Sequence, residues 1–141
     1  MSAARFSAEG LRQLGLELGP NDLVRGATWV RASGAIEVPL TDVDLYIAEA
    51  CEIRTILMLA DPDGGDCEID IWRAPFSSFP PDSGDSIFAT NPPSITNADT
   101  NSDSTLTGVS VNNSAGDVLR FHLTSSSTFE RISVFLVLRK L

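Results

Sequence analysis

In the stretch Gly64-Gly65-Asp66-Cys67-Glu68-Ile69-Asp70-Ile71-Trp72, apolar and polar side chains alternate directly after a pair of glycines. The closing run Ile132-Ser133-Val134-Phe135-Leu136-Val137-Leu138 is apolar at almost every position. Alternation with a period of two is typical of an antiparallel strand with one buried face, whereas a continuous apolar run is typical of a strand covered on both faces. The two stretches predict an all-β fold in which the closing run lies in the centre of a sheet or at the seam of an oligomer.

Further strand-like runs occur along the chain, each bounded by Gly, Pro, Asn or Asp. They lie at residues 28–30 and 36–38, which flank a Ser33-Gly34 turn as a predicted hairpin, and at residues 43–47, 51–60 and 119–124. The polar stretch 74–104 predicts loops rather than sheet. About eight strands with strong turn signals favour an antiparallel β-sandwich of the jelly-roll type.

Two strands carry more apolar side chains than one sandwich core needs. Strict alternation along residues 51–60 places Ile56 and Met58 on the second face of that strand, and alternation along the closing run does the same for Phe135 and Val137. An apolar second face has to be covered by a loop, an arm or another subunit. We therefore predict a homotrimer with a subunit interface drawn from these four side chains.

The first twenty-five residues differ in character from the rest. They contain glycines that weaken a helix and a Gly19-Pro20 stop, so we expect residues 1–25 to form an N-terminal arm and residues 26–141 to form the sandwich domain. Apolar side chains that cannot fold alone must dock on something, either their own sandwich or a neighbour. The candidate docking residues of this arm are Phe6, Leu11, Leu14, Leu16 and Leu18.

Composition sets the outer limits of the function. With 141 residues, 43% of them hydrophobic, the chain can bury one core of ordinary size. Its formal net charge of −9 repels phosphate backbones and anionic lipids, so nucleic acid and membrane are not expected partners. The N-terminus lacks the apolar block of a signal peptide, which predicts a protein made and kept in a cytoplasm. Cys51 and Cys67 are then expected to be buried free thiols.

No constellation of catalytic or metal-binding residues stands out. The single histidine, His122, lies in a predicted strand without a nucleophile motif near it. Residues 61–66 and 99–103 place oxygen ligands at alternate positions, as calcium loops do, but both are incomplete, and Asx turns use the same residues. We expect a protein that is not an enzyme, with no catalytic residue, no metal and no cofactor.

The order of motifs in the C-terminal half resembles the small β-sandwich domains of tailed-phage virion proteins. Those domains share the series GSIxxDIW, PP, DSxLTGW, aGDxLxFxv and vtvxLxv, and residues 53–138 follow it with DIW at 70–72, Pro80-Pro81, Asp103 to Gly108 and Gly116-Asp117. The chain departs from the series at Asp66-Cys67, where Ser-Ile is usual, and at Val109, where Trp is usual.

The resemblance implies a homotrimeric structural protein of the virion, made in the infected host. The leading expectation is a capsid decoration or cement protein that binds the major capsid protein on the outer shell, with its N-terminal arm as the docking element. The alternative is a glycan-binding tail-fibre or appendage tip, in which Trp72, Phe76 and Phe79 contact a host surface glycan.

Overall fold

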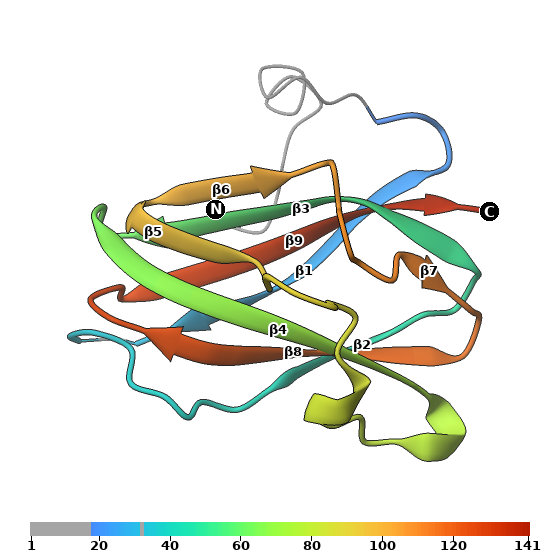
Figure 1. Ribbon diagram of the computed structural model, residues 1–141, viewed down its shortest axis with the longest axis horizontal. Helices are drawn as coiled ribbons and strands as arrows, with labels where there is room; N and C mark the ends of the chain where they lie inside the picture. The colour runs from blue at the N-terminus through green and yellow to red at the C-terminus, as the bar shows by residue number, and fades with distance from the viewer. Residues whose placement is uncertain (1–17, 32) are drawn as a thin grey trace.

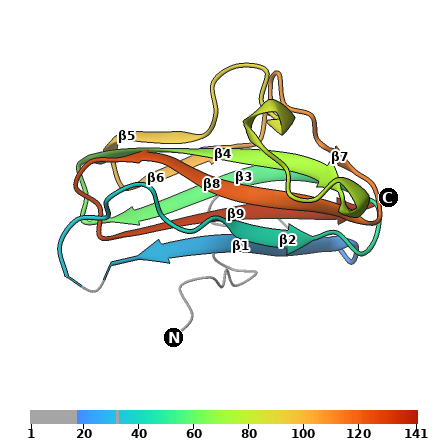
Figure 2. The same cartoon turned by 90° about the horizontal axis from the view of Figure 1, so that it is seen from below.

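The structure is a computed structural model that describes residues 18–31 and 33–141, and these form two antiparallel sheets packed face to face (Figures 1 and 2). Sheet A consists of β1 (Asp22–Val30), β9 (Arg131–Lys140), β3 (Cys51–Asp61) and β6 (Thr100–Asp103), in that order, with the short β7 (Asn112–Asn113) paired to β3. Sheet B consists of β2 (Val43–Tyr46), β8 (Asp117–Ser126), β4 (Gly65–Pro75) and β5 (Ser94–Ala98), in that order. The predicted all-β sandwich is confirmed.

The strands pair in a nested order. β1 pairs with β9, β2 with β8, β3 with β6 and β4 with β5, so the outermost partners are far apart in sequence and the innermost are neighbours. Within the sheets, β9 also joins β3, and β8 also joins β4. This is the strand order of a jelly roll, in which two Greek keys wrap into a double sheet.

The main core lies between the two sheets. β9 runs through the centre of sheet A, as its apolar sequence predicts, and sends Ile132, Val134, Leu136 and Leu138 inward. From sheet B the alternating residues of β4 and β8 meet them, and these include Ile69, Ile71, Leu119, Phe121 and Leu123, none more than 2% exposed. Burial of this apolar area is the main term that stabilises the sandwich.

A β-bulge at Arg54 changes which side of β3 faces the core. Ile53 pairs with Leu138 and Thr55 pairs with Val137, so Arg54 is an extra residue without a partner on β9. A single extra residue shifts the alternation by one position for the rest of the strand.

The predicted position of Ile56 and Met58 on the outer face is therefore wrong. After the bulge both side chains point between the sheets, where Ile56 is 2% and Met58 1% exposed within the main core. Two side chains enclosed in the core of their own subunit do not form a subunit interface. The same shift turns Leu57 and Leu59 outward instead.

A second apolar cluster lies on the outer face of sheet A, and we call it the outer layer. Its buried members are Phe135 and Val137 of β9 and Leu57 of β3, and the partly buried Val24 and Leu59 pack against them. The prediction that Phe135 and Val137 face away from the main core is thus confirmed. Both are nevertheless almost fully buried, at 1% and 6% exposure, so neither offers a bare surface to a second subunit.

Other differences from the predicted strands have local causes. β1 begins at Asp22, so residues 22–25 belong to the sheet and not to an arm. Residues 36–38 form no strand. Ile36 instead donates its backbone N–H to the carbonyl of Phe129 at 2.7 Å and buries its side chain in the core. β5 and β6 lie within the stretch predicted as loops, because short polar strands suffice at the edges of a sheet.

Both cysteines are free and buried. Burial raises the pKa of the Cys67 thiol to about 11, so at pH 8 only about one molecule in a thousand carries the reactive thiolate there. We expect neither thiol to react with Ellman's reagent within minutes in the native protein, and both to react at once in guanidinium chloride. Fast labelling of either thiol in native buffer would contradict this.

Candidate functional site

The outer face of sheet B combines aromatic and charged side chains. Because Leu119, Phe121 and Leu123 of β8 point into the core, the residues between them point outward. The same alternation turns Trp72 of β4 and Tyr46 of β2 to this side. Two phenylalanines from the corner after β4 complete the group. We call it the aromatic face, and its members are Tyr46, Trp72, Phe76, Phe79, Arg120 and His122.

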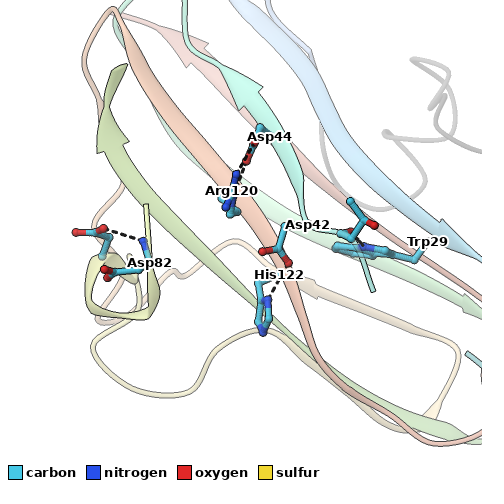
Figure 3. A network of polar contacts seen from close by, with 8 residues as sticks. Trp29, Asp42, Asp44, Asp82, Arg120 and His122 are labelled. Atoms are coloured by element: carbon cyan, nitrogen blue, oxygen red, sulfur yellow. Dashed lines mark hydrogen bonds and ion pairs between the residues drawn. The ribbon is translucent and has the colours of Figure 1, made fainter. Parts of the chain in front are cut away.

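Arg120 lies at the centre of this face and is held from two sides. Its Nε donates to Asp44 Oδ1 at 2.7 Å and its Nη2 donates to Asp44 Oδ2 at 2.9 Å, a bidentate pair set by the β2–β8 register (Figure 3). These hydrogen bonds raise the pKa of Arg120 above its ordinary value, so the side chain stays charged. The guanidinium carbon also lies 5.1 Å from the centre of the Phe79 ring, within the range of a cation–π contact.

His122 lies two residues further along β8. Its Nδ1 is 2.8 Å from Asp42 Oδ1, and Figure 3 shows the ring below that carboxylate. The ring also stacks on Trp72, with the centroids 4.5 Å apart and the planes 22° from parallel. The indole Nε1 of Trp72 is shielded from solvent and has no hydrogen-bond partner among the described residues.

Sheet A anchors the segment that carries the two aspartates. Trp29 of β1 reaches out of its sheet and donates its indole Nε1–H to the carbonyl of Thr41 at 3.1 Å (Figure 3). Asp42 is the residue after Thr41, and Asp44 lies two residues further on, in β2. A buried tryptophan, 5% exposed, thus fixes the backbone from which both carboxylates meet β8.

The corner after β4 presents the phenylalanines. It contains two short 3₁₀ turns, η1 (Phe76–Ser78) and η2 (Ser83–Asp85), and the second is closed by a capping box between Asp82 and Asp85. Phe76 is 69% exposed and packs edge-on against the Tyr46 ring, with centroids 6.2 Å apart. Phe79 is 48% exposed. Exposed apolar rings that gather in one patch are typical of surfaces that contact a partner.

The arrangement combines residue types that are typical of binding surfaces. The imidazole of His122 contacts the carboxylate of Asp42 and the indole of Trp72. Among the described residues, no hydroxyl or thiol is hydrogen-bonded to this imidazole. Exposed rings next to an arginine instead match the residue types that dominate binding surfaces.

The three residues predicted to contact a glycan do come together, because Trp72, Phe76 and Phe79 all belong to the aromatic face. Reasoning from the sequence missed Tyr46 and Arg120. Their outward positions follow from strand alternation, so a search of the polar strand faces for aromatic and arginine residues would have found them. The pairing of Arg120 with Asp44 needs the strand register, which the sequence does not contain.

The predicted docking arm falls almost entirely outside the described residues. Phe6, Leu11, Leu14 and Leu16 are among residues 1–17, and their part in binding stays a prediction. Leu18 is described and is 37% exposed.

In the two acidic stretches, residues 61–66 lead from β3 into β4, and residues 99–103 lie largely in β6, so neither is a free loop. Asp103 Oδ1 accepts the backbone N–H groups of Thr105 and Leu106, both at 3.0 Å, and Asp66 Oδ1 accepts that of Asn97 at 2.7 Å. The contacts of Asp103 are of the Asx type that forms the alternative to a calcium site, whereas Asp66 bonds to a distant residue of β5. Within residues 18–31 and 33–141 no group of three His, Cys, Asp or Glu side chains is placed to hold a metal ion.

None of the helical segments in the described part of the chain could span a lipid bilayer. Comparison of the chain with protein-family models, with curated proteins and with solved structures finds no match. The case for a function therefore rests on the aromatic face, the two-sided sheet A and the order of sequence motifs.

Proposed function

We propose that the protein is a non-enzymatic structural protein of a tailed-phage virion, a capsid decoration or cement protein that binds the major capsid protein on the outer shell as a homotrimer. The motif series along residues 53–138 supports the class of protein. The jelly-roll order of the strands is compatible with it, since jelly rolls are common in viral capsid domains.

The observation that carries the proposal is the aromatic face. Tyr46, Phe76 and Phe79 are all exposed, at 58%, 69% and 48%, and gather beside Arg120 on one side of the sandwich. Tyr, Phe and Arg are enriched at protein interfaces, and such anchors supply most of the binding free energy. We propose this face for the capsid contact or the trimer seam, since Ile56 and Met58, which were predicted for the subunit interface, are enclosed in the core.

Binding to purified shells tests the proposal. We expect the protein to co-sediment with shells of its own phage from which it has been removed, and the double substitution of Tyr46 and Phe76 by alanine to weaken binding by about 100-fold, since two interface anchors are each worth more than about 1 kcal/mol. Val38→Ala is the matched control, because Val38 is exposed at 41% but lies outside the aromatic face. Mass measurement at micromolar concentration should give a trimer. Absence of binding to such shells would refute the decoration role.

A second candidate is a glycan-binding tip of a tail fibre or appendage. The observation that favours it is the stack of Trp72 on His122 beside Asp42, which puts ring surface next to hydrogen-bonding groups. Sugars present apolar C–H faces that pack on aromatic rings and hydroxyls that bond to such groups.

The two candidates predict different losses for the same variants. If the face binds a glycan, Trp72→Ala or Phe76→Ala should abolish attachment to host cells while the protein is still incorporated into virions. If it binds the shell, Phe76→Ala should reduce incorporation first. Scoring particle-bound protein and cell attachment for each variant separates them, with Val38→Ala again as the control.

A further inference from the structure

A cavity between the edge strands of the two sheets forms a binding site separate from the aromatic face. We infer that it binds a small amphiphilic anion, an aliphatic carboxylate of about six to eight carbons, with its tail between the sheets and its carboxylate on Arg25. Tyr46 lines the cavity and also belongs to the aromatic face. The inference does not depend on the capsid proposal.

The cavity lies at the side of the sandwich where the two sheets part. In the described sheets β1 is the edge strand of sheet A and β2 is the edge strand of sheet B, and residues of both line the cavity (Figure 2). β2 ends at Tyr46, and residues 47–49 continue the wall toward β3. The end of β9 closes the inner side. The enclosed volume is about 250 Å³.

The inner wall of the cavity is apolar. Leu138 of β9 is 2% exposed, and Ile47 and Cys51, on either side of the β2–β3 connection, are each 4% exposed. Leu23 and Leu45 add apolar surface from the two edge strands. A cavity of 250 Å³ has room for about eight groups of the size of a water molecule, at about 30 Å³ each. A methylene group is of similar size, so a short aliphatic chain fills the space.

Arg25 brings a charge to this apolar cavity. It follows the alternation of β1, in which Leu23 lines the cavity and Ala27 lies in the main core, so it occupies an inward position of an edge strand. Its Nη1 donates to the carbonyl of Val24 at 2.9 Å. No ion pair with a carboxylate of the described residues holds this guanidinium.

The other cations of the described residues are all paired. Arg31, Arg54, Arg73, Arg120, Arg131, Arg139 and Lys140 each have a carboxylate within 4.0 Å. Lys140, which also lines the cavity, is paired with Glu49 at 3.2 Å, so these two charges offset each other. In a chain with nineteen acidic and ten basic side chains, a cation without a carboxylate stands out. The cavity therefore has a net positive charge beside its apolar wall.

This combination matches the chemistry of an aliphatic carboxylate. Small-molecule sites are mostly apolar and contain a few polar groups that fix the orientation of the ligand. The planar guanidinium can donate two N–H groups to one carboxylate, and such charge-assisted pairs are the strong ones. An inward charge on an edge strand can also serve only to prevent pairing with another chain, a role that needs no ligand.

Calorimetric titration of the full-length protein with sodium octanoate tests the inference. We expect saturable binding with one ligand per chain. Affinity should rise about fourfold for each methylene added from butanoate to octanoate, as burial of a methylene group predicts. Arg25→Gln should weaken octanoate binding by about 10-fold or more, since a charge-assisted hydrogen bond is lost. Arg131→Gln is the matched control, because Arg131 is also exposed but lies at the other end of β9 from the cavity.

Two further measurements separate the tail from the charge. Octanol has the same chain without the carboxylate, so it should bind the parent protein and the Arg25→Gln variant equally. Ala48→Trp places a large ring at an exposed position of the cavity wall and should abolish the binding of both ligands. Thermal unfolding of each variant without ligand confirms that it is folded.

Three results would overturn the inference. Absence of saturable octanoate binding would leave Arg25 as a charge that only protects the edge of β1. Equal octanoate affinity of the parent and the Arg25→Gln variant would refute the contact with the carboxylate. Unchanged binding by Ala48→Trp would place the ligand outside the cavity. None of these measurements involves shells or glycans, so a failure here is distinct from a failure of the proposed function.

Discussion

Deletion of Arg54 is expected to abolish folding, whereas Arg54→Ala is expected to cost less than about 1 kcal/mol. The alanine variant loses only an exposed ion pair, in which Arg54 donates to Glu52 at 3.0 Å. The deletion removes the extra residue of the bulge. Without it, the two halves of β3 cannot both present their apolar side chains to the core.

The size of the effect follows from the side chains that change face. The deletion would turn one pair of core side chains to the outside, either Cys51 and Ile53 or Ile56 and Met58. Polar or outer-layer residues of β3 would take the place of that pair in the core. Each large apolar side chain brought out of the core costs about 1.5–3 kcal/mol, and burial of a polar group adds to it, against a total stability of about 5–15 kcal/mol. Urea unfolding followed by circular dichroism measures both variants. If the deletion variant unfolded cooperatively at nearly the same urea concentration as the parent protein, the bulge would not be what decides which side chains of β3 face the core.

Phe129→Ala is expected to destabilise the protein by about 3–5 kcal/mol, as large-to-small changes in a packed core do. Phe129 is 0% exposed, and its ring lies about 3.1 Å from where a Cβ on Gly65 would be, so it fills the end of the sandwich beside the first residue of β4. Its carbonyl also accepts the N–H of Ile36. Loss of the ring leaves a cavity under both segments.

The matched control is Phe76→Ala, the same substitution at a ring that is 69% exposed. It should cost no more than about 1 kcal/mol, since surface positions rarely cost more. Chemical denaturation of the two variants side by side gives the comparison. Equal losses would mean either that Phe129 is not a core residue or that Phe76 is not a surface residue. A small loss at Phe76 also shows that its variants are folded in binding assays.

Alternation of apolar side chains predicted most of the long strands. β4 and β8 follow that pattern, β3 follows it on either side of its bulge, and the two-sided apolar sequence of β9 predicted its central place. The bulge in β3 could not be predicted, because neither Gly nor Pro marks Arg54. Phe129 was missed for a related reason, because it is a single apolar residue in an irregular segment, where periodicity has nothing to detect. Ile36 was placed in a predicted strand, although it lies in an irregular segment that bonds to Phe129.

The candidate site was predictable only in part. The outward position of Trp72 followed from the alternation of β4, and Phe76 and Phe79 stood out as apolar residues in a polar stretch. Their meeting with Arg120 and His122 depends on how β4, β8 and β2 align, and on a corner whose path is set by capping contacts. Such alignment arises from the pairing of distant segments, which one sequence does not encode in a readable local pattern.

The central position of β9 also bears on how the chain is made. In the described sheet, β1 and β3 are joined through β9, which follows the other strands of the sandwich in sequence. Sheet A therefore lacks its central strand until residues 131–140 have left the ribosome. At synthesis rates of about 5–20 residues per second, β1 lacks its partner strand for several seconds after it has been synthesised. We expect productive folding to begin only after residues 131–140 have been synthesised, and nascent chains to depend on protection from self-association until then.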